Sequence, residues 1–299
     1  MKLGYIGLGE LGGHLAMSLV RGGNELLVFD TNLKRSERHV AAGAKRAHFI
    51  DELAAQADHI FTCLPSPAIS EMVLDEILPH ARPGTVWIEN STLGRDDIQR
   101  LAAKAQAAGL KVLEAPVTGG VHLAARGEIT VLVGGDEALF NQYQPLLKNL
   151  GNRIFYMGPI GSAAVIKVIT NMLAFIHLVA DAEALMLAKR GGLDLGQAWR
   201  AIAASSGTSF VHETEGQLIL NGSYDIAFTM DLALKDLGFA MKFGEDFDVP
   251  LDLARRTFET FQKGKAAYGG SAQSTQIAKL LEDALKTNLR AEGFPARLV

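Results

Sequence analysis

Short apolar runs alternate with longer amphipathic segments through residues 1–160. The amphipathic segments have helical spacing; in Asp96–Ala108, for example, Ile98, Leu101 and Ala105 fall on one face. Strands that alternate with helices in this way are typical of βαβ units, so we expect a mainly parallel, doubly wound sheet with right-handed crossovers. The predicted strands are Lys2–Ile6, Glu25–Phe29, His59–Leu64, Thr85–Glu89, Lys111–Leu113, Ile129–Val133 and Ile154–Tyr156.

The pattern changes after Gly158-Pro159, where helical spacing follows without a clear strand. The first helix of this half, Ser162–Arg190, is predicted to be roughly 40 Å long and is apolar nearly all round. Other helices or a second subunit should therefore wrap it, and a homodimer, or a homotetramer built from dimers, is expected. We expect two domains, 1–160 and an all-helical 161–299, with the long helix at their junction.

The stretch Ala163–Leu187 is also long enough to raise the question of a membrane span. Five of its side chains would be costly in hydrocarbon, so we interpret it as the buried helix of a soluble protein. These are Lys167, Asn171, His177, Asp181 and Glu183.

Composition narrows the class of protein further. Hydrophobic residues make up 48% of the 299 residues, which excludes an intrinsically disordered chain. The 29 Lys and Arg against 33 Asp and Glu leave a net charge of −4, so neither nucleic acid nor an anionic membrane is an expected partner. A single Cys63 excludes a disulfide framework, and the histidines have no metal-ligand spacing. No targeting segment is predicted, and a cytoplasmic location is expected.

A glycine-rich segment follows the first predicted strand and begins a helical pattern. Its glycines would allow a tight turn, close approach of the backbone to a pyrophosphate, and close packing of helix on strand. Asp30 ends the second predicted strand, where a carboxylate can accept hydrogen bonds from both ribose hydroxyls of NAD and repel the 2′-phosphate of NADP. We predict a Rossmann domain that binds NAD; Lys34 and Arg35 leave NADP open, and an ordinary glycine turn is the structural alternative. The predicted cofactor contacts here are Gly7, Leu8, Gly9, Glu10, Leu11, Gly12 and Asp30.

Four segments together resemble motifs of the β-hydroxyacid dehydrogenase family, typified by 3-hydroxyisobutyrate dehydrogenase. They occur in the family's order and spacing over nearly the whole chain. The segments are Gly7–Gly13, similar to G-L-G-x-M-G; Glu114–Gly120, similar to D-A-P-V-S-G-G; Gly161-x5-Lys167-x3-Asn171; and Lys235–Leu237, similar to K-D-L. The chain departs from the family at Thr118, usually Ser, and at Gln273–Thr275, where an acid often stands. His122 and Arg126 also replace small residues in the expected substrate loop.

Lys167 is the predicted catalytic group. An apolar helix would desolvate this lysine and lower its pKa from about 10.4, which suits proton exchange with an alcohol near neutral pH. Asn171 lies four residues on, on the same helix face, and would hold the substrate or the amine in line. The alternative is a snorkelling lysine beside an exposed Asn.

The resemblance implies roles for the remaining candidates. Substrate binding is expected at Thr118, Gly119, Gly120, Phe210 and Asp236, and cofactor binding at Leu64, Pro65, Thr92 and Lys235. Each has a structural alternative: a tight turn for the glycines, ordinary loop chemistry at the strand ends, and an exposed charged pair for Lys235 and Asp236. Cys63 is expected to be a buried small hydrophobe.

The sequence thus favours an NAD-dependent dehydrogenase that oxidises a short 3-hydroxy acid to its semialdehyde, or catalyses the reverse. An NADPH-dependent reductase of succinic semialdehyde, glyoxylate or a sulfonated aldehyde is the nearest alternative. A catalytically silent dinucleotide-binding scaffold and an imine reductase are disfavoured because both usually lack the lysine. A 6-phosphogluconate dehydrogenase would have a much larger helical domain.

Overall fold

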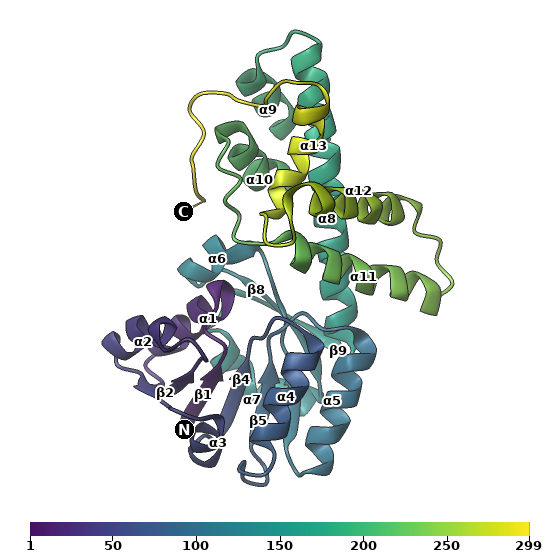
Figure 1. The fold of residues 1–299 in the computed structure, drawn as a ribbon. Coiled ribbons are helices and arrows are strands. Elements are labelled where there is room, and N and C mark those ends of the chain that lie inside the picture. The colour runs from purple at the N-terminus through teal and green to yellow at the C-terminus, as the bar shows by residue number, and fades with distance from the viewer. Residues whose placement is uncertain (299) are drawn as a thin grey trace. The chain divides into compact units, whose positions relative to one another are not determined.

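The computed structural model describes residues 1–298 and divides into two compact units. Unit 1 (Met1–Lys167) is built on a sheet, and unit 2, from Val168 onward, is helical. Figure 1 labels the strands of the sheet in unit 1 and the helices of unit 2. The predicted fold class, a Rossmann-type sheet followed by an all-helical half that starts with one long helix, is confirmed.

The sheet of unit 1 has the order β3-β2-β1-β4-β5-β6-β8-β7, with β9 paired to β8. From β3 to β6 every pair is parallel, whereas β8 runs antiparallel to both β6 and β7. The strands among residues 1–298 are β1 (Lys2–Ile6), β2 (Glu25–Phe29), β3 (Lys45–Arg46), β4 (His59–Thr62), β5 (Val86–Glu89), β6 (Lys111–Glu114), β7 (Val117–Thr118), β8 (Thr130–Gly135) and β9 (Arg153–Gly158).

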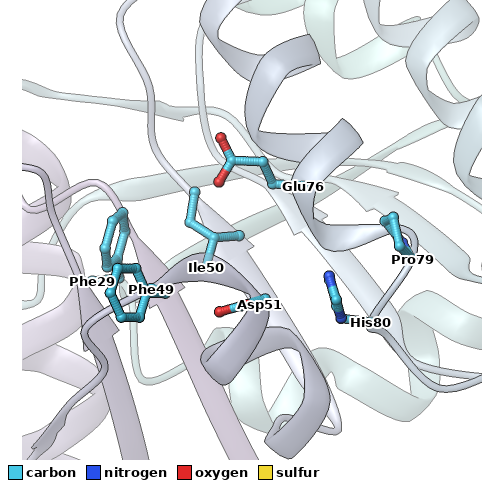
Figure 2. A pocket seen from close by; sticks show the side chains of 7 residues that line it. All are labelled: Phe29, Phe49, Ile50, Asp51, Glu76, Pro79 and His80. Carbon is cyan, nitrogen blue, oxygen red and sulfur yellow. The ribbon is translucent and has the colours of Figure 1, made fainter.

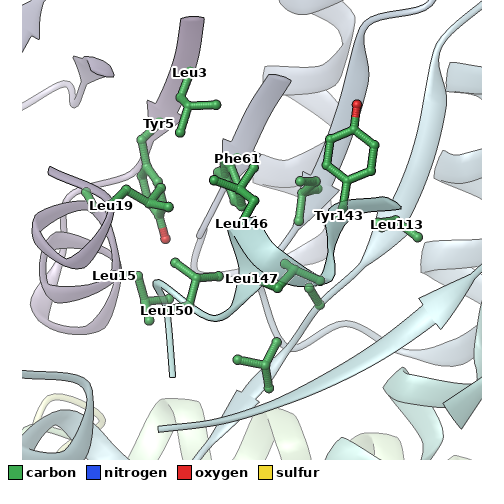
Figure 3. Packing of buried hydrophobic residues seen from close by; sticks show 14 of the residues in the cluster. Leu3, Tyr5, Leu15, Leu19, Phe61, Leu113, Tyr143, Leu146, Leu147 and Leu150 are labelled. Carbon is green, nitrogen blue, oxygen red and sulfur yellow. The ribbon is translucent and has the colours of Figure 1, made fainter. Parts of the chain in front are cut away.

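Successive strand residues point to opposite faces, so the sheet has two cores. Phe61 and Leu113 belong to the first core, which α1, α6 and α7 cover. Figure 3 shows leucines of α1 and α7 meeting Tyr5 and Phe61 there. Trp87 belongs to the second core, which α3, α4 and α5 cover. The helical segments of unit 1 are α1 (Glu10–Arg21), η1 (Leu33–Ser36), α2 (Glu37–Ala41), α3 (Ile50–Gln56), α4 (Pro67–Ile77), α5 (Arg95–Ala107), α6 (Gly120–Arg126) and α7 (Glu137–Leu147).

Two short strands were not predicted from the pattern. β3 and β7 have two residues each, too few to show alternation. β8 runs antiparallel to β6 and β7 but parallel to β9, and all the other pairs are parallel, so the expectation of a mainly parallel sheet is confirmed. All seven predicted strands are present, with ends that differ by one or two residues.

Unit 2 packs its helices around a core that includes Phe175, Leu185, Leu237 and Phe261. No strand element follows β9 in the part of the chain that the structure describes, up to residue 298. Its helical segments are the greater part of α8 (Ser162–Arg190), α9 (Leu195–Ala203), α10 (Phe210–Asn221), α11 (Met230–Asp246), α12 (Asp252–Tyr268), η2 (Ser274–Ala278) and α13 (Lys279–Ala284).

Helix α8 has the predicted bounds and is shared by both units, because unit 1 ends at Lys167. By length and composition it could cross a membrane, and it is the one such helix among residues 1–298. Phe175 and Leu178 of α8 are nevertheless buried in the core of unit 2, and Lys167 is buried as well. The helix is therefore packed against protein over part of its circumference.

Candidate active site

The glycine-rich segment from the end of β1 into the first turn of α1 contains two glycines that packing requires and one that faces open space. Gly7 has φ +96°, and a Cβ there would lie 2.3 Å from the carbonyl oxygen of Cys63. A Cβ on Gly12 would lie 2.2 Å from the carbonyl oxygen of Gly7. A Cβ on Gly9 would meet no atom within 4 Å. The space beside Gly9 is therefore where the backbone can be approached, as binding of a pyrophosphate requires.

Asp30 lies directly after β2 with 7% of its surface exposed. One carboxylate oxygen accepts the backbone N–H of Leu8 at 2.8 Å, and the other accepts that of Asn32 at 2.8 Å. Asp30 thus holds the glycine loop to the end of β2. The Arg35 guanidinium lies 3.6 Å from the same carboxylate, half-exposed, at the edge where a 2′-phosphate would come.

The ends of β4 and β5 are linked by hydrogen bonds. The Ser91 hydroxyl accepts the N–H of Leu64 at 2.7 Å, while the Ser91 N–H donates to Glu89. Pro65 is exposed and Thr92 partly buried, and both follow the carboxyl ends of parallel strands, where such sheets bind ligands.

Cys63 is only partly buried, which differs from the expectation of a buried small hydrophobe, and its side chain packs against the first core. The strand ends at Thr62, two residues before the predicted end at Leu64, and Cys63 lies beside the glycine-rich segment.

A groove of about 280 Å³ lies beside the end of β2, between α3 and α4. Figure 2 shows Phe29 and Phe49 at one end of this groove and His80 at the other. Its lining residues are Phe29, Phe49, Ile50, Asp51, Glu76, Pro79 and His80, none of which the sequence analysis singled out.

The predicted acid-binding segment leads directly into a helix. Thr118 is the last residue of β7, and Gly119 and Gly120 have φ of +125° and +86°, which favour glycine. The prediction that His122 and Arg126 lie in a loop is wrong, because both belong to α6. The His122 ring lies 3.1 Å from the position that a Cβ of Gly120 would occupy, so it borders this segment.

In unit 2, Asn171 and Asp236 form one hydrogen-bonded group. A carboxylate only accepts, so it faces the amide nitrogen: Asn171 Nδ2 donates to Asp236 Oδ2 at 2.6 Å. Asp236 is 1% exposed, and the Lys235 ammonium lies 3.2 Å from its other oxygen. The alternative of an exposed charged pair is therefore wrong for Asp236. Its contact with Asn171 fixes the amide with Oδ1 as the acceptor, one helical turn after Lys167 on α8.

Two other candidates have less specific surroundings. Phe210 begins α10 and is 53% exposed, so its place in a substrate pocket stays a prediction. The Gln273 side chain accepts the N–H of Phe228, and the Thr275 hydroxyl donates to the carbonyl of Tyr224. Residues 273–275 therefore hold the segment that leads into α11.

A buried ionisable cluster lies elsewhere in unit 2. His212 places Nδ1 2.5 Å from Asp181 and Nε2 2.9 Å from the carbonyl of Trp199, so both ring nitrogens face acceptors. Although burial lowers the pKa of His212, its hydrogen bonds to Asp181 and Trp199 outweigh that effect and raise it above its usual value. Burial, with the Asp181 charge, raises the pKa of Glu215 to about 8. Asp181 thus pairs within the helical core, as expected from the sequence.

The residues present fit a dinucleotide. Open space beside Gly9, the start of α1 and the carboxylate of Asp30 supply the three features that pyrophosphate and ribose need. No group of three or more His, Cys, Asp or Glu side chains suited to a metal occurs within residues 1–298.

Comparisons with known proteins agree with this geometry. A family model described as the NAD binding domain of 6-phosphogluconate dehydrogenase matches residues 2–158, and one described as NAD-binding of NADP-dependent 3-hydroxyisobutyrate dehydrogenase matches residues 161–281. The chain is 32% identical to 2-(hydroxymethyl)glutarate dehydrogenase of Eubacterium barkeri, over 94% of this chain and 95% of that one. It is 33% identical to NAD-dependent L-serine dehydrogenase of Pseudomonas aeruginosa, over 81% and 84%.

Among solved structures, 3-hydroxyisobutyrate dehydrogenase of Mycobacterium tuberculosis with L-serine superposes with a TM-score of 0.84 at 27% identity. The match covers 94% of this chain and 98% of that one. The two family models together, and each of the relatives, extend over most of the chain, across both units. The chain therefore belongs to the 3-hydroxyisobutyrate dehydrogenase family of NAD(P)-dependent oxidoreductases that act on hydroxy acids.

Proposed function

We propose that the chain oxidises a short 3-hydroxy acid to its semialdehyde with NAD, and that Lys167 is the general acid–base. When bound, NAD would supply the acceptor for the hydride that leaves the carbinol carbon. The amine of Lys167 takes the hydroxyl proton as the C–O bond becomes a carbonyl, and returns it in the reverse direction. The balance is one alcohol and NAD⁺ consumed, and one aldehyde, NADH and a proton formed.

The observation that carries this proposal is the Asn171–Asp236 hydrogen bond beside a buried lysine. Lys167 is 8% exposed on the helix that also carries Asn171, four residues later. Because Asp236 fixes the Asn171 amide, the acceptor Oδ1 has one orientation with which to align a hydroxyl or the amine. A surface lysine with a mobile neighbour would have no such constraint.

For the substrate, we propose that Thr118, Gly119 and Gly120 bind the carboxylate. The positive φ values of the two glycines allow backbone amides to approach an anion, and the Thr118 hydroxyl adds a donor. The names of the relatives contain three compounds: 2-(hydroxymethyl)glutarate, L-serine and 3-hydroxyisobutyrate. Each of these compounds has a carboxylate two carbons from a hydroxyl group. Arg126, at the end of the helix that follows, would suit a second anionic group on the substrate, which would compete with its ion pair to Glu128 at 3.0 Å.

NAD is proposed as the preferred cofactor because the Asp30 carboxylate lies where a 2′-phosphate would be repelled. The half-exposed Arg35 beside Asp30 is the observation that favours the second candidate, an NADPH-dependent aldehyde reductase. The remaining cofactor contacts, Leu64, Pro65, Thr92 and Lys235, are proposed from their places at strand ends and on α11.

We also propose a homodimer or homotetramer in which α8 contributes an apolar face. Ile169, Leu173 and Leu187 are exposed by 37%, 44% and 76%, and their spacing places them along one side of the helix. Light scattering on the Leu173→Glu and Leu187→Glu double variant should give a smaller particle than the unsubstituted protein. An unchanged mass would remove α8 from the interface.

A cytoplasmic location completes the proposal. Lys167 and Asp181 on α8 are buried against protein, and hydrocarbon would accommodate neither at low cost. Cell fractionation should recover the protein in the cytosolic supernatant, and recovery with the membrane would contradict the proposal.

The experiment that tests the function is NADH formation with 2-(hydroxymethyl)glutarate, L-serine and 3-hydroxyisobutyrate, with Lys167→Ala beside the unsubstituted protein. Turnover of one acid that falls by about 10³-fold or more in the variant supports both the reaction and the role of Lys167. Turnover that survives the substitution removes Lys167 from its role. No turnover of any acid, with NAD bound, refutes the dehydrogenase direction and favours the reductase.

A further inference from the structure

Glu114 ends β6 and is almost completely buried, at 1% exposure. Its carboxylate accepts three backbone N–H groups from the start of α8. Oε1 accepts those of Gly161 at 2.6 Å and Ala163 at 3.0 Å, and Oε2 accepts that of Ala164 at 3.1 Å. The first turn of a helix leaves N–H groups without helical partners, and an anion there also interacts favourably with the helix dipole. Glu114 therefore caps α8 from a strand 47 residues earlier.

The site is shaped to hold this side chain. A Cβ on Gly134 would lie 2.2 Å from Glu114 Oε1 and 2.9 Å from its Cδ and Cγ, and no other residue is among the nearest atoms. Gly134 does not have a positive φ, so the absence of a side chain there serves the carboxylate and not the backbone conformation. The space left by the missing side chain of Gly134 on β8 is therefore occupied by the Glu114 carboxylate.

This contact joins two parts of the proposed reaction within unit 1. The chain runs from Glu114 through two residues into β7 and the Thr118 segment. At the other side of the contact, Ala163 precedes Lys167 by one helical turn, on the same face of α8. A shift of the first turn of α8 against β6 would move the Lys167 amine relative to the bound acid.

We propose that Glu114 is a positioning residue for hydride transfer: its carboxylate sets where the Lys167 amine lies relative to the Thr118–Gly120 segment. The inference rests on the proposed role of Lys167. It goes beyond that role, because it assigns catalytic alignment to a side chain that touches neither substrate nor cofactor.

Burial raises the pKa of Glu114 to about 7, against the opposing effect of its three hydrogen bonds. Facing it are the amides at the start of α8, Gly134 on β8 and, in register on β5, the buried Glu89, whose pKa burial also raises. Because this pKa lies above the value of 4.5 for an exposed carboxyl, opening the contact between Glu114 and the start of α8 releases a proton. The contact should therefore become more stable as the pH falls through about 7.

The test compares Glu114→Gln with Asp136→Asn, each removing a carboxylate that caps a helix in unit 1. Asp136 accepts the N–H of Leu139 at the start of α7, which carries no proposed site residue. We expect Glu114→Gln to lower kcat about tenfold or more, with KM for NAD changed less than about twofold, because the glycine loop is not involved. Asp136→Asn should leave kcat within about twofold.

Two further measurements keep the proposal falsifiable if Glu114→Gln is unstable. Gly134→Ala should lower kcat on its own and have no further effect in a Glu114→Ala background, since only Glu114 occupies that space. Hydrogen exchange without substrate should show less protection of Ala163 and Ala164 in Glu114→Gln and, in the unsubstituted protein, less protection above pH 7 than below it.

Loss of protection at Ala163 and Ala164 without loss of kcat would overturn the positioning role, as would an equal loss of kcat in Asp136→Asn. Turnover that depends on Lys167 but not on Glu114 overturns this inference and leaves the proposed function intact. An unsubstituted protein that turns over none of the acids, in either direction, overturns the proposed function and the positioning role with it.

Discussion

The substitutions Gly9→Ala and Gly12→Ala are three residues apart in the glycine-rich segment, and we expect them to act differently. Gly9→Ala should weaken nucleotide binding and leave stability nearly unchanged, whereas Gly12→Ala should lower stability. A Cβ at position 9 meets nothing within 4 Å, whereas one at position 12 lies 2.2 Å from the Gly7 carbonyl oxygen. Gly9 has φ −62° and ψ −168°, which alanine also adopts without strain. The first substitution therefore occupies only space meant for a ligand, and the second disrupts packing of α1 on β1.

The magnitudes follow from these distances. Alanine at the N-cap of α1 loses about 0.5–1 kcal/mol, and the reduced freedom of the unfolded chain returns about 0.4–1 kcal/mol, so Gly9→Ala should leave Tm nearly unchanged. Overpacking against a bound pyrophosphate costs about 1–3 kcal/mol, which lowers NAD affinity by roughly 5- to 150-fold. The same cost within the fold at Gly12 should lower Tm by roughly 2–12 °C for a unit of this size.

Differential scanning fluorimetry of the ligand-free variants and calorimetric titration with NAD measure the two effects separately. A Gly9→Ala variant that binds NAD as tightly as the unsubstituted protein would refute the assignment of the space beside Gly9 to the pyrophosphate. A fall in Tm of several degrees in Gly9→Ala, equal to that of Gly12→Ala, would refute the distinction between the two glycines.

Three further outcomes can be measured directly. Because the folded pKa of His212 lies above its unfolded value of about 6.5, its pair with Asp181 should stabilise the fold fully below pH 6.5 and progressively less as the pH rises through the folded pKa. In urea unfolding, Asp181→Asn should lower the free energy of unfolding by about 3–5 kcal/mol at pH 6 and should show a smaller change with pH over that window. Arg35→Ala should weaken NADP binding while leaving NAD affinity within about threefold, since the arginine neighbours Asp30 at the edge of the site and makes no contact that the loop needs; equal losses for both nucleotides would contradict this. Asp236→Leu should lower kcat by about tenfold or more because the amide on α8 loses its fixed orientation, and an unchanged kcat would contradict that role.

The elements that the sequence predicts well are those long enough to show a period. The strand Lys2–Ile6 and the helix Ser162–Arg190 have the predicted bounds, because five strand residues and eight helical turns carry a clear pattern. β3 and β7 could not be predicted, since two residues have no period and exist as strands only through their neighbours. The antiparallel direction of β8 depends likewise on pairing with β6, which no local pattern records.

The candidate site shows the same limit. Glycine spacing located the cofactor loop, because the positive φ of Gly7 and the close approach of Gly12 to Gly7 arise within one short segment. The close approach of Gly7 to Cys63 could not be predicted from this spacing. The partners of Asp236 and Glu114 could not be predicted, as their contacts join segments 65 and 47 or more residues apart. The available signal for Glu114 was a glutamate at a position where the family motif has an aspartate. The role of the longer side chain could be recognised only once the position of α8 was known.

The cap that Glu114 places on α8 also bears on the order in which the chain matures during synthesis. β6 leaves the ribosome well before the start of α8, so the Glu114 carboxylate lacks these three donors until residues 161–164 emerge. A fragment that ends at Gly158 would contain every strand of the described sheet yet lack the donors, whereas a fragment that ends a few residues beyond Lys167 would contain them. The nucleotide-binding half should therefore become a stable, protease-resistant fragment only after translation has passed into the long helix.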